Sequence, residues 1–129
     1  MRRLVIGLAL LVVGWIIGFI PQYMKARHFE LQAGVCDTRL QLAEIRRLSA
    51  LTYVSATQLN YGTAADYAKQ MFTQAQNLAG NTSDPSTRNL ATNLLSARDK
   101  VTADLSKADA QVVSELQPIV LEVQGAANK

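Results

Sequence analysis

The sequence LVIGLALLVVGWIIGFI, residues 4–20, contains no charged side chain and no side-chain amide. A helix over these seventeen residues would be roughly 25 Å long, slightly less than the ~30 Å hydrocarbon core of a bilayer. Flanking residues can supply the difference, because arginine and lysine extend toward the headgroups and tyrosine prefers that depth. We therefore expect a transmembrane helix within residues 1–21. The residues expected to contact lipid headgroups are Arg2, Arg3, Tyr23, Lys25 and Arg27.

A cleaved secretory signal is the alternative for this segment, since Arg2 and Arg3 precede the apolar run. The run is longer than the ~7–15 apolar residues usual in a signal peptide, and no A-x-A-like cleavage site follows Ile20. The sequence therefore predicts an uncleaved signal anchor. Arg2 and Arg3 slightly outweigh Lys25 and Arg27 under the positive-inside rule, because the amino terminus adds its charge. We expect a cytoplasmic N-terminus and an extracytoplasmic C-terminal domain, periplasmic if the source is a bacterium with two membranes.

Three glycines in the apolar run share one face of the expected helix. Gly7, Gly14 and Gly18 are spaced by seven and four residues, and the last two form a GxxxG motif, which lets two helix backbones approach closely. Trp15 would lie deep in the span rather than at an interface, which indicates contact with protein. Glycine is also common in membrane helices generally, so the motif alone is a weak signal. We expect Gly7, Gly14, Trp15 and Gly18 to pack against another membrane helix.

The charge of the remaining chain is nearly balanced. After Arg2 and Arg3 are set aside, eleven Lys or Arg stand against ten Asp or Glu, so the pI of about 9.2 does not indicate a nucleic-acid partner. The single cysteine excludes an internal disulfide. Cys36 is expected to be a small buried apolar residue, with an intermolecular thiol as the alternative.

Helical periodicity dominates the chain after the apolar run, and no strand-like alternation occurs. Apolar residues recur every three or four positions, which predicts helices at about 23–59, 63–79 and 85–124. Between the first two helices, Gly62 can end one helix and Thr63 can cap the next. A heptad rhythm runs straight through this point, so one long helix is the alternative. We favour the break.

A second boundary is better marked. Gly80 is followed by polar turn residues, and Asp84 and Pro85 suit the N-cap and the first position of a new helix. The expected fold is all-α: the transmembrane helix, then a helical domain at 22–124 built as an antiparallel hairpin or three-helix bundle, and a frayed tail at 125–129. The positions expected to face its core are Leu31, Val35, Thr38, Leu42, Ile45, Leu48, Leu51, Val54, Tyr61, Ala64, Ala68, Met71, Ala75, Leu78, Leu90, Leu94, Val101, Leu105, Ala108, Val112, Ile119 and Val123.

The expected core is thin, because alanine occupies many of its positions. An alanine side chain buries little apolar area, and the free energy gained from burial scales with that area. We therefore expect a weakly stable helical domain that gains from association.

The sequence lacks the common catalytic and metal-binding motifs. One histidine, His28, excludes paired-histidine zinc motifs, and it lies eight residues from Cys36, about 12 Å along a helix, too far for a nucleophile and its base. The seven glycines form neither a P-loop nor a dinucleotide fingerprint. We expect no enzyme activity, no cofactor and no metal.

The predicted function is therefore structural. We expect a non-enzymatic, single-pass accessory, scaffold or assembly subunit of a larger membrane complex, which works through helix–helix contacts with other subunits or with itself. The alternatives are a sensor-like ligand-binding module that signals through a partner, and a homo-oligomeric coiled-coil spacer. Aromatic and arginine side chains are common at the centre of protein interfaces. The residues expected to dock a partner are Tyr53, Tyr61, Tyr67, Arg46 and Arg47. For the tyrosines, packing between helices is the alternative.

Overall fold

The computed structural model describes residues 34–126, and in this range every regular element is helical, which confirms the all-α prediction. The elements are a helix over residues 34–57, called helix 34–57 below, α2 (Tyr61–Asn81), α3 (Pro85–Ser96), α4 (Arg98–Ser106) and α5 (Val112–Gly125). None of the helices described is both long and apolar enough to cross a bilayer. The predicted anchor at 1–21, with its packing and headgroup residues, lies outside the described range. Those residues are Gly7, Gly14, Trp15, Gly18, Arg2, Arg3, Tyr23, Lys25 and Arg27.

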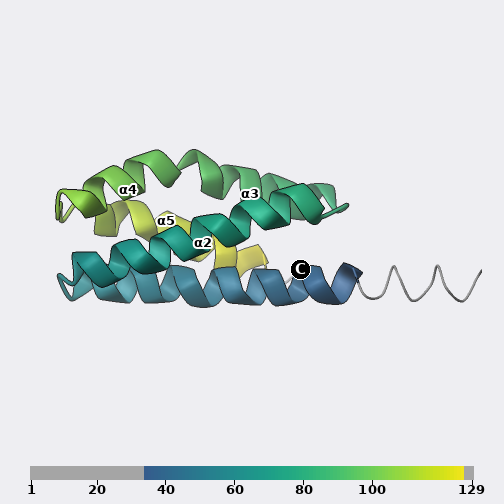
Figure 1. Cartoon of the computed structure of the whole chain (residues 1–129), viewed down its shortest axis with the longest axis horizontal. Helices are drawn as coiled ribbons and strands as arrows, with labels where there is room; N and C mark the ends of the chain where they lie inside the picture. Colours follow the sequence, from purple (N-terminus) through teal and green to yellow (C-terminus); the bar gives the residue numbers. More distant parts are fainter. Residues whose placement is uncertain (1–33, 127–129) are drawn as a thin grey trace, which may run out of the picture. The chain divides into compact units, whose positions relative to one another are not determined.

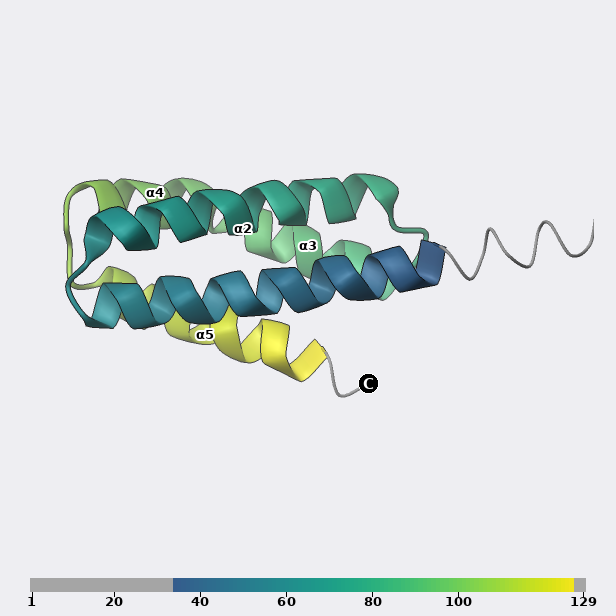
Figure 2. The same cartoon turned by 60° about the horizontal axis from the view of Figure 1, so that its bottom comes forward.

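The chain divides into two units, Met1–Cys36 and Asp37–Lys129, and the second is an antiparallel four-helix bundle. Its four rods are residues 37–57 of helix 34–57, then α2, then α3 and α4 placed end to end, then α5 (Figures 1 and 2). Successive rods run in opposite directions, and α5 contacts both α3 and α4. The predicted hairpin or three-helix bundle is wrong in this respect, because the chain reverses once more than expected.

The additional reversal lies between α4 and α5, inside the helix predicted at 85–124. Ala108 adopts φ 54°, its N–H donates to the Leu105 carbonyl at 3.2 Å, and the Asp109 N–H donates to the Asp104 carbonyl at 2.9 Å. This pair of bonds is a Schellman motif, which ends a helix with one left-handed residue, usually glycine. The sequence carries alanine there and so does not predict the turn, and Ala108 is exposed rather than in the core.

The same device ends helix 34–57. Leu59 adopts φ 60°, its N–H donates to the Ala56 carbonyl at 3.0 Å, and the Asn60 N–H donates to the Ser55 carbonyl at 2.9 Å. The Asn60 side chain then caps α2 by accepting from the Thr63 N–H at 3.4 Å. The predicted break is therefore confirmed and the continuous helix is wrong. Leu59 ends the helix in place of Gly62, and Asn60 caps the next helix in place of Thr63.

The boundary before α3 agrees with the prediction. Pro85 is the first residue of α3, and Asp84 is its N-cap, accepting from the Thr87 N–H at 2.8 Å. Helix α2 continues through Gly80 to Asn81, and no glycine in the described range has a positive φ. A further interruption separates α3 from α4 at Ala97, where no proline or glycine stands, and the two helices continue in the same direction.

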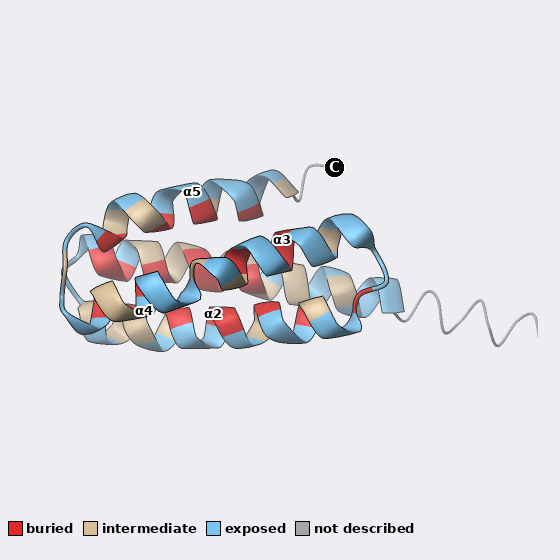
Figure 3. Cartoon of the chain, turned by 90° about the horizontal axis from the view of Figure 1, so that it is seen from above, coloured by how far each residue is buried: buried red, intermediate tan, exposed pale blue. Residues whose placement is uncertain are grey.

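The core lies along the axis of the bundle, where the buried faces of all four rods meet (Figure 3). Leu31 lies outside the described range, and most of the other positions predicted to face the core are buried. Val35, Val54 and Ala108 are exposed. Five of the core's eighteen members are alanine, which is the thin packing expected from the sequence. The buried apolar residues are Ile45, Leu48, Ala56, Ala64, Ala68, Met71, Phe72, Ala75, Leu78, Leu90, Ala91, Leu94, Val101, Leu105, Val112, Leu116, Ile119 and Val123.

Candidate functional site

Helix 34–57 carries apolar residues on the face that points away from the core. Leu40 is 65% exposed and Val54 is 46% exposed, although both are large apolar side chains. Ala43 and Arg47 are exposed and Ala50 is half-buried, and the five residues are separated by steps of three, four, three and four. We call Leu40, Ala43, Arg47, Ala50 and Val54 the outward seam. This spacing is that of the contact positions in a coiled coil.

The one charge in the outward seam is paired within its own helix. The guanidinium of Arg47 donates to Glu44 through Nε at 2.9 Å and through Nη2 at 2.6 Å. These hydrogen bonds lower the pKa of Glu44 and raise the pKa of Arg47. The bidentate contact fixes the orientation of Arg47 and neutralises its charge along the seam.

The five residues predicted to dock a partner are distributed over two helices. Tyr53 lies on helix 34–57 and Tyr61 and Tyr67 lie on α2, and all three are half-buried against the core. Arg46 and Arg47 lie on helix 34–57 with Tyr53.

Arg46 has a different environment from Arg47. It is half-buried, and its Nε is buried and has no hydrogen-bond partner among the described residues. The half-burial of the three tyrosines agrees with the helix-packing alternative, and the docking role of all five residues stays a prediction.

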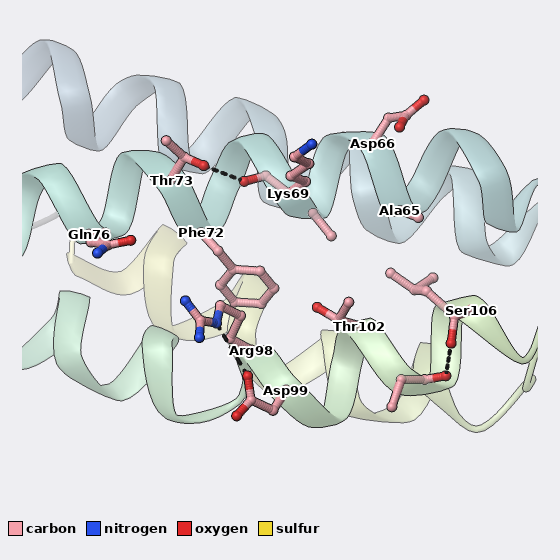
Figure 4. A pocket seen from close by; sticks show the side chains of 13 residues that line it. Ala65, Asp66, Lys69, Phe72, Thr73, Gln76, Arg98, Asp99, Thr102 and Ser106 are labelled. Atoms are coloured by element: carbon pink, nitrogen blue, oxygen red, sulfur yellow. Dashed lines mark hydrogen bonds and ion pairs between the residues drawn. The ribbon is translucent and has the colours of Figure 1, made fainter.

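A groove of about 650 Å³ separates α2 from α4, and sequence reasoning missed it. Figure 4 shows the ring of Phe72 pointing from α2 into the space between the helices, next to Arg98. Lys69 and Asp66 stand on the α2 side, and Asp99 stands beside Arg98, whose Nε donates to it at 3.3 Å. Both signs of charge therefore surround an apolar floor. No local signal could predict the groove, since it depends on the register in which α4 packs against α2.

A group of charged residues lies where α4 meets α5. Lys100 forms an ion pair with Glu115, which raises the pKa of Lys100. Partial burial raises the pKa of Asp104, and the neighbouring carboxyl groups of Glu115 and Asp109 raise it further. The residues described include no group of three His, Cys, Asp or Glu side chains placed to hold a metal ion. This group is a contact between two helices.

Cys36 is exposed, so the expectation that it is buried is wrong, and the intermolecular thiol stays a prediction. His28 lies outside the described range. Comparison with known proteins adds no assignment, since no protein family, curated protein or solved structure matches this chain.

Proposed function

We propose that this chain is a non-enzymatic, single-pass membrane protein that acts as a scaffold or assembly subunit through helix–helix contacts. Residues 4–20 supply the anchor, with the N-terminus in the cytoplasm and the bundle outside it. The observation that carries the proposal is the outward seam. A four-helix bundle buries one face of each helix and has no internal use for a second apolar face.

The energetics favour a partner on this face. Burying a leucine or valine side chain that was fully exposed contributes about 1.5–3 kcal/mol. Leu40 and Val54 retain roughly half or more of their exposure, so the bundle leaves much of this energy unused. The Arg47–Glu44 pair lies between them and adds no net charge to the contact. A helix laid along the seam would cover both apolar side chains and this pair.

The test is the native mass and composition of the full-length protein, tagged after Lys129 and extracted in mild detergent. We expect it to purify at fixed stoichiometry with itself or with other membrane subunits. Leu40→Glu and Val54→Glu should each reduce this association. Gln70→Glu, at an exposed position of α2, is the matched control and should not. A monomer in every variant, or a chain that is not retained in membranes, would contradict the proposal.

The groove between α2 and α4 favours a second candidate, a ligand-binding module that signals through a partner. Its two charge signs around Phe72 suit a small zwitterion with an apolar body, such as an aromatic amino acid. Titration calorimetry with phenylalanine and with alanine measures this directly. Lys69→Ala and Arg98→Ala should remove binding of phenylalanine, and absence of binding to the wild-type chain would dismiss this candidate.

A further inference from the structure

We propose that the outward seam is occupied by the same seam of a second copy of this chain, in a parallel, in-register, two-stranded coiled coil. The inference rests on the proposed function, because an anchor at residues 1–21 points both copies in the same direction from the membrane. Each copy keeps its own four-helix bundle, and the two bundles meet along helix 34–57.

Helix 34–57 has a continuous heptad register on its outer face. Leu40, Arg47 and Val54 take one contact position at intervals of seven residues. Ala43, Ala50 and Thr57 take the other, so Thr57 extends the outward seam by one residue at its C-terminal end. The opposite face is occupied by the core, where Ile45 and other buried residues pack. The helix therefore has two contact faces, of which the bundle uses one. In a parallel pair, every seam residue meets its own equivalent, so the surface is complementary to itself.

The charges beside the seam fit the parallel register. Arg39 directly precedes Leu40, and Glu44 lies five residues after Arg39. In a parallel coiled coil, the flanking position of Arg39 in one copy faces the flanking position of Glu44 in the other copy. The twofold axis forms this pair twice. An antiparallel arrangement would place Arg39 near the opposite end of the partner helix, far from Glu44.

The polar seam position also favours this arrangement. A single polar residue at one contact position fixes register and favours a defined number of strands, at a cost in stability. Arg47 is such a residue within the helix, since the other polar position, Thr57, is the last residue of the helix, and two unpaired arginines facing each other would repel. The hydrogen bonds from Arg47 to Glu44 hold its charge neutralised, so two ion pairs meet instead of two cations.

The dimer is weak by itself, because Leu40 and Val54 are the large apolar residues in the seam and alanine fills Ala43 and Ala50. Anchoring both copies in one membrane offsets this weakness, because confinement to a surface raises the effective concentration of each copy near the other and limits their relative orientations. The pairing is therefore strongest for full-length protein in a bilayer, where the copies share orientation.

A cysteine scan along helix 34–57 tests the seam in full-length protein in phosphatidylcholine vesicles. In a Cys36→Ser background, single cysteines replace Leu40, Ala43, Val54 or Thr57, and disulfide formation is measured after oxidation with copper phenanthroline in air. We expect dimer crosslinks at these four positions to exceed several-fold those of two exposed controls. The controls are Gln70→Cys on α2 and Thr92→Cys on α3.

Three results would overturn the inference. Equal crosslinking at seam and control positions would mean random collision, and no crosslinking at any position would mean an unoccupied seam. Crosslinks in an added Arg47→Cys variant, with none at Leu40→Cys or Val54→Cys, would mean an antiparallel pair.

The inference and the proposed function fail in different ways. Unrelated membrane subunits that purify with the chain while the seam stays uncrosslinked would retain the proposed function and reject this inference. Seam crosslinks in a chain that fails to integrate into membranes would retain the pairing of two copies and reject the proposed membrane function.

A charge exchange gives an independent readout. Arg39→Glu faces Glu44 of the other copy with a like charge, so crosslinking through Leu40→Cys should fall several-fold. In an Arg47→Ala background, which removes the cation that Glu44 neutralises, adding Glu44→Arg to Arg39→Glu restores opposite charges across the interface, and crosslinking should recover above the level of Arg39→Glu in the same background. Arg98→Glu on α4 is the matched control and should leave crosslinking unchanged. Failure of the Arg39→Glu and Glu44→Arg combination to recover in that background would overturn the parallel register.

Discussion

Within residues 34–126, Leu59 and Ala108 hold the left-handed backbone conformation that glycine adopts most readily. This conformation costs an L-residue roughly 1–2 kcal/mol, because the Cβ approaches a backbone oxygen. Each is the left-handed residue of a Schellman turn and each is exposed, so neither side chain gains much from packing in return. The backbone is therefore strained at the turn before α2 and at the turn before α5.

Replacing these residues with glycine should stabilise the fold. Leu59→Gly and Ala108→Gly should each raise the free energy of unfolding by about 0.5–1 kcal/mol, since the relief of strain exceeds the added chain entropy. Urea unfolding of full-length protein in detergent measures the change. Gln70→Gly, at an exposed position inside α2, should lower stability by about 1 kcal/mol. A loss of stability at both turns would contradict the strain argument.

Asp84 links the start of α3 to pH. Its carboxylate accepts hydrogen bonds from Thr87 and Ser86, which lower its pKa from 3.8 to about 2. Because the pKa is lowered in the folded state, the stabilisation by the ionised Asp84 cap is complete above about pH 3.8 and is lost as the pH falls through about 2.

Melting temperatures between pH 5 and pH 2 test this link. Asp84→Ala should be less stable than wild type at pH 5, and the difference should shrink toward pH 2. Asp84→Asn keeps a capping oxygen without a titration, so its stability relative to Asp84→Ala should not change with pH. A constant difference between wild type and Asp84→Ala would exclude the ionised cap.

At the scale of elements, the boundaries that can be predicted from the sequence are those made by local chemistry. Asp84 and Pro85 define the start of α3 through their own side chains, so no tertiary information is needed. The reversal at Ala108 has a weaker mark, because lysine, alanine and glutamine around it are good helix formers and only Asp109, whose Oδ1 accepts from the Gln111 N–H at 2.9 Å, favours a turn. Its position is decided by the packing of α5 against α3 and α4, which the periodic pattern does not contain.

The outward seam shows the same division between pattern and packing. The heptad spacing is visible in the sequence. Predicting from it that Leu51 and Val54 face the core requires the further assumption that apolar residues face inward. Helix 34–57 has apolar residues on two faces, so periodicity alone cannot say which face the bundle covers. Ile45 and Leu48 are buried while Leu40 and Val54 are exposed. The positions of α2 and the other rods determine which face of the helix is covered.

The contact between α4 and α5 adds a prediction at this scale. The pKa of Asp104 is raised, first by burial and then by Glu115, so ionising it in the folded state is unfavourable. A raised pKa of an acid means that this penalty is absent below the unfolded-state pKa and appears as the pH rises through the folded-state value. Asp104→Asn should therefore raise the melting temperature at pH 7, with a gain that disappears below about pH 4 as the wild-type carboxyl is protonated. Asp66→Asn, at an exposed position of α2, is the control, and an equal gain in both variants would contradict the argument.

For the whole molecule, folding uses the buried core and association uses the outward seam, so the two should separate on mutation. Met71 is fully buried in a core with many alanines, and Met71→Ala should cost about 2–5 kcal/mol, a large part of the stability of a small bundle. Leu40→Glu removes no core contact, so circular dichroism of dilute full-length protein in detergent should show an unchanged helix content and melting temperature. In densely loaded vesicles, Leu40→Glu should lose dimer crosslinking through Val54→Cys, while Gln70→Glu should keep it. A melting temperature that falls as far for Leu40→Glu as for Met71→Ala would mean that the seam belongs to the fold rather than to a partner.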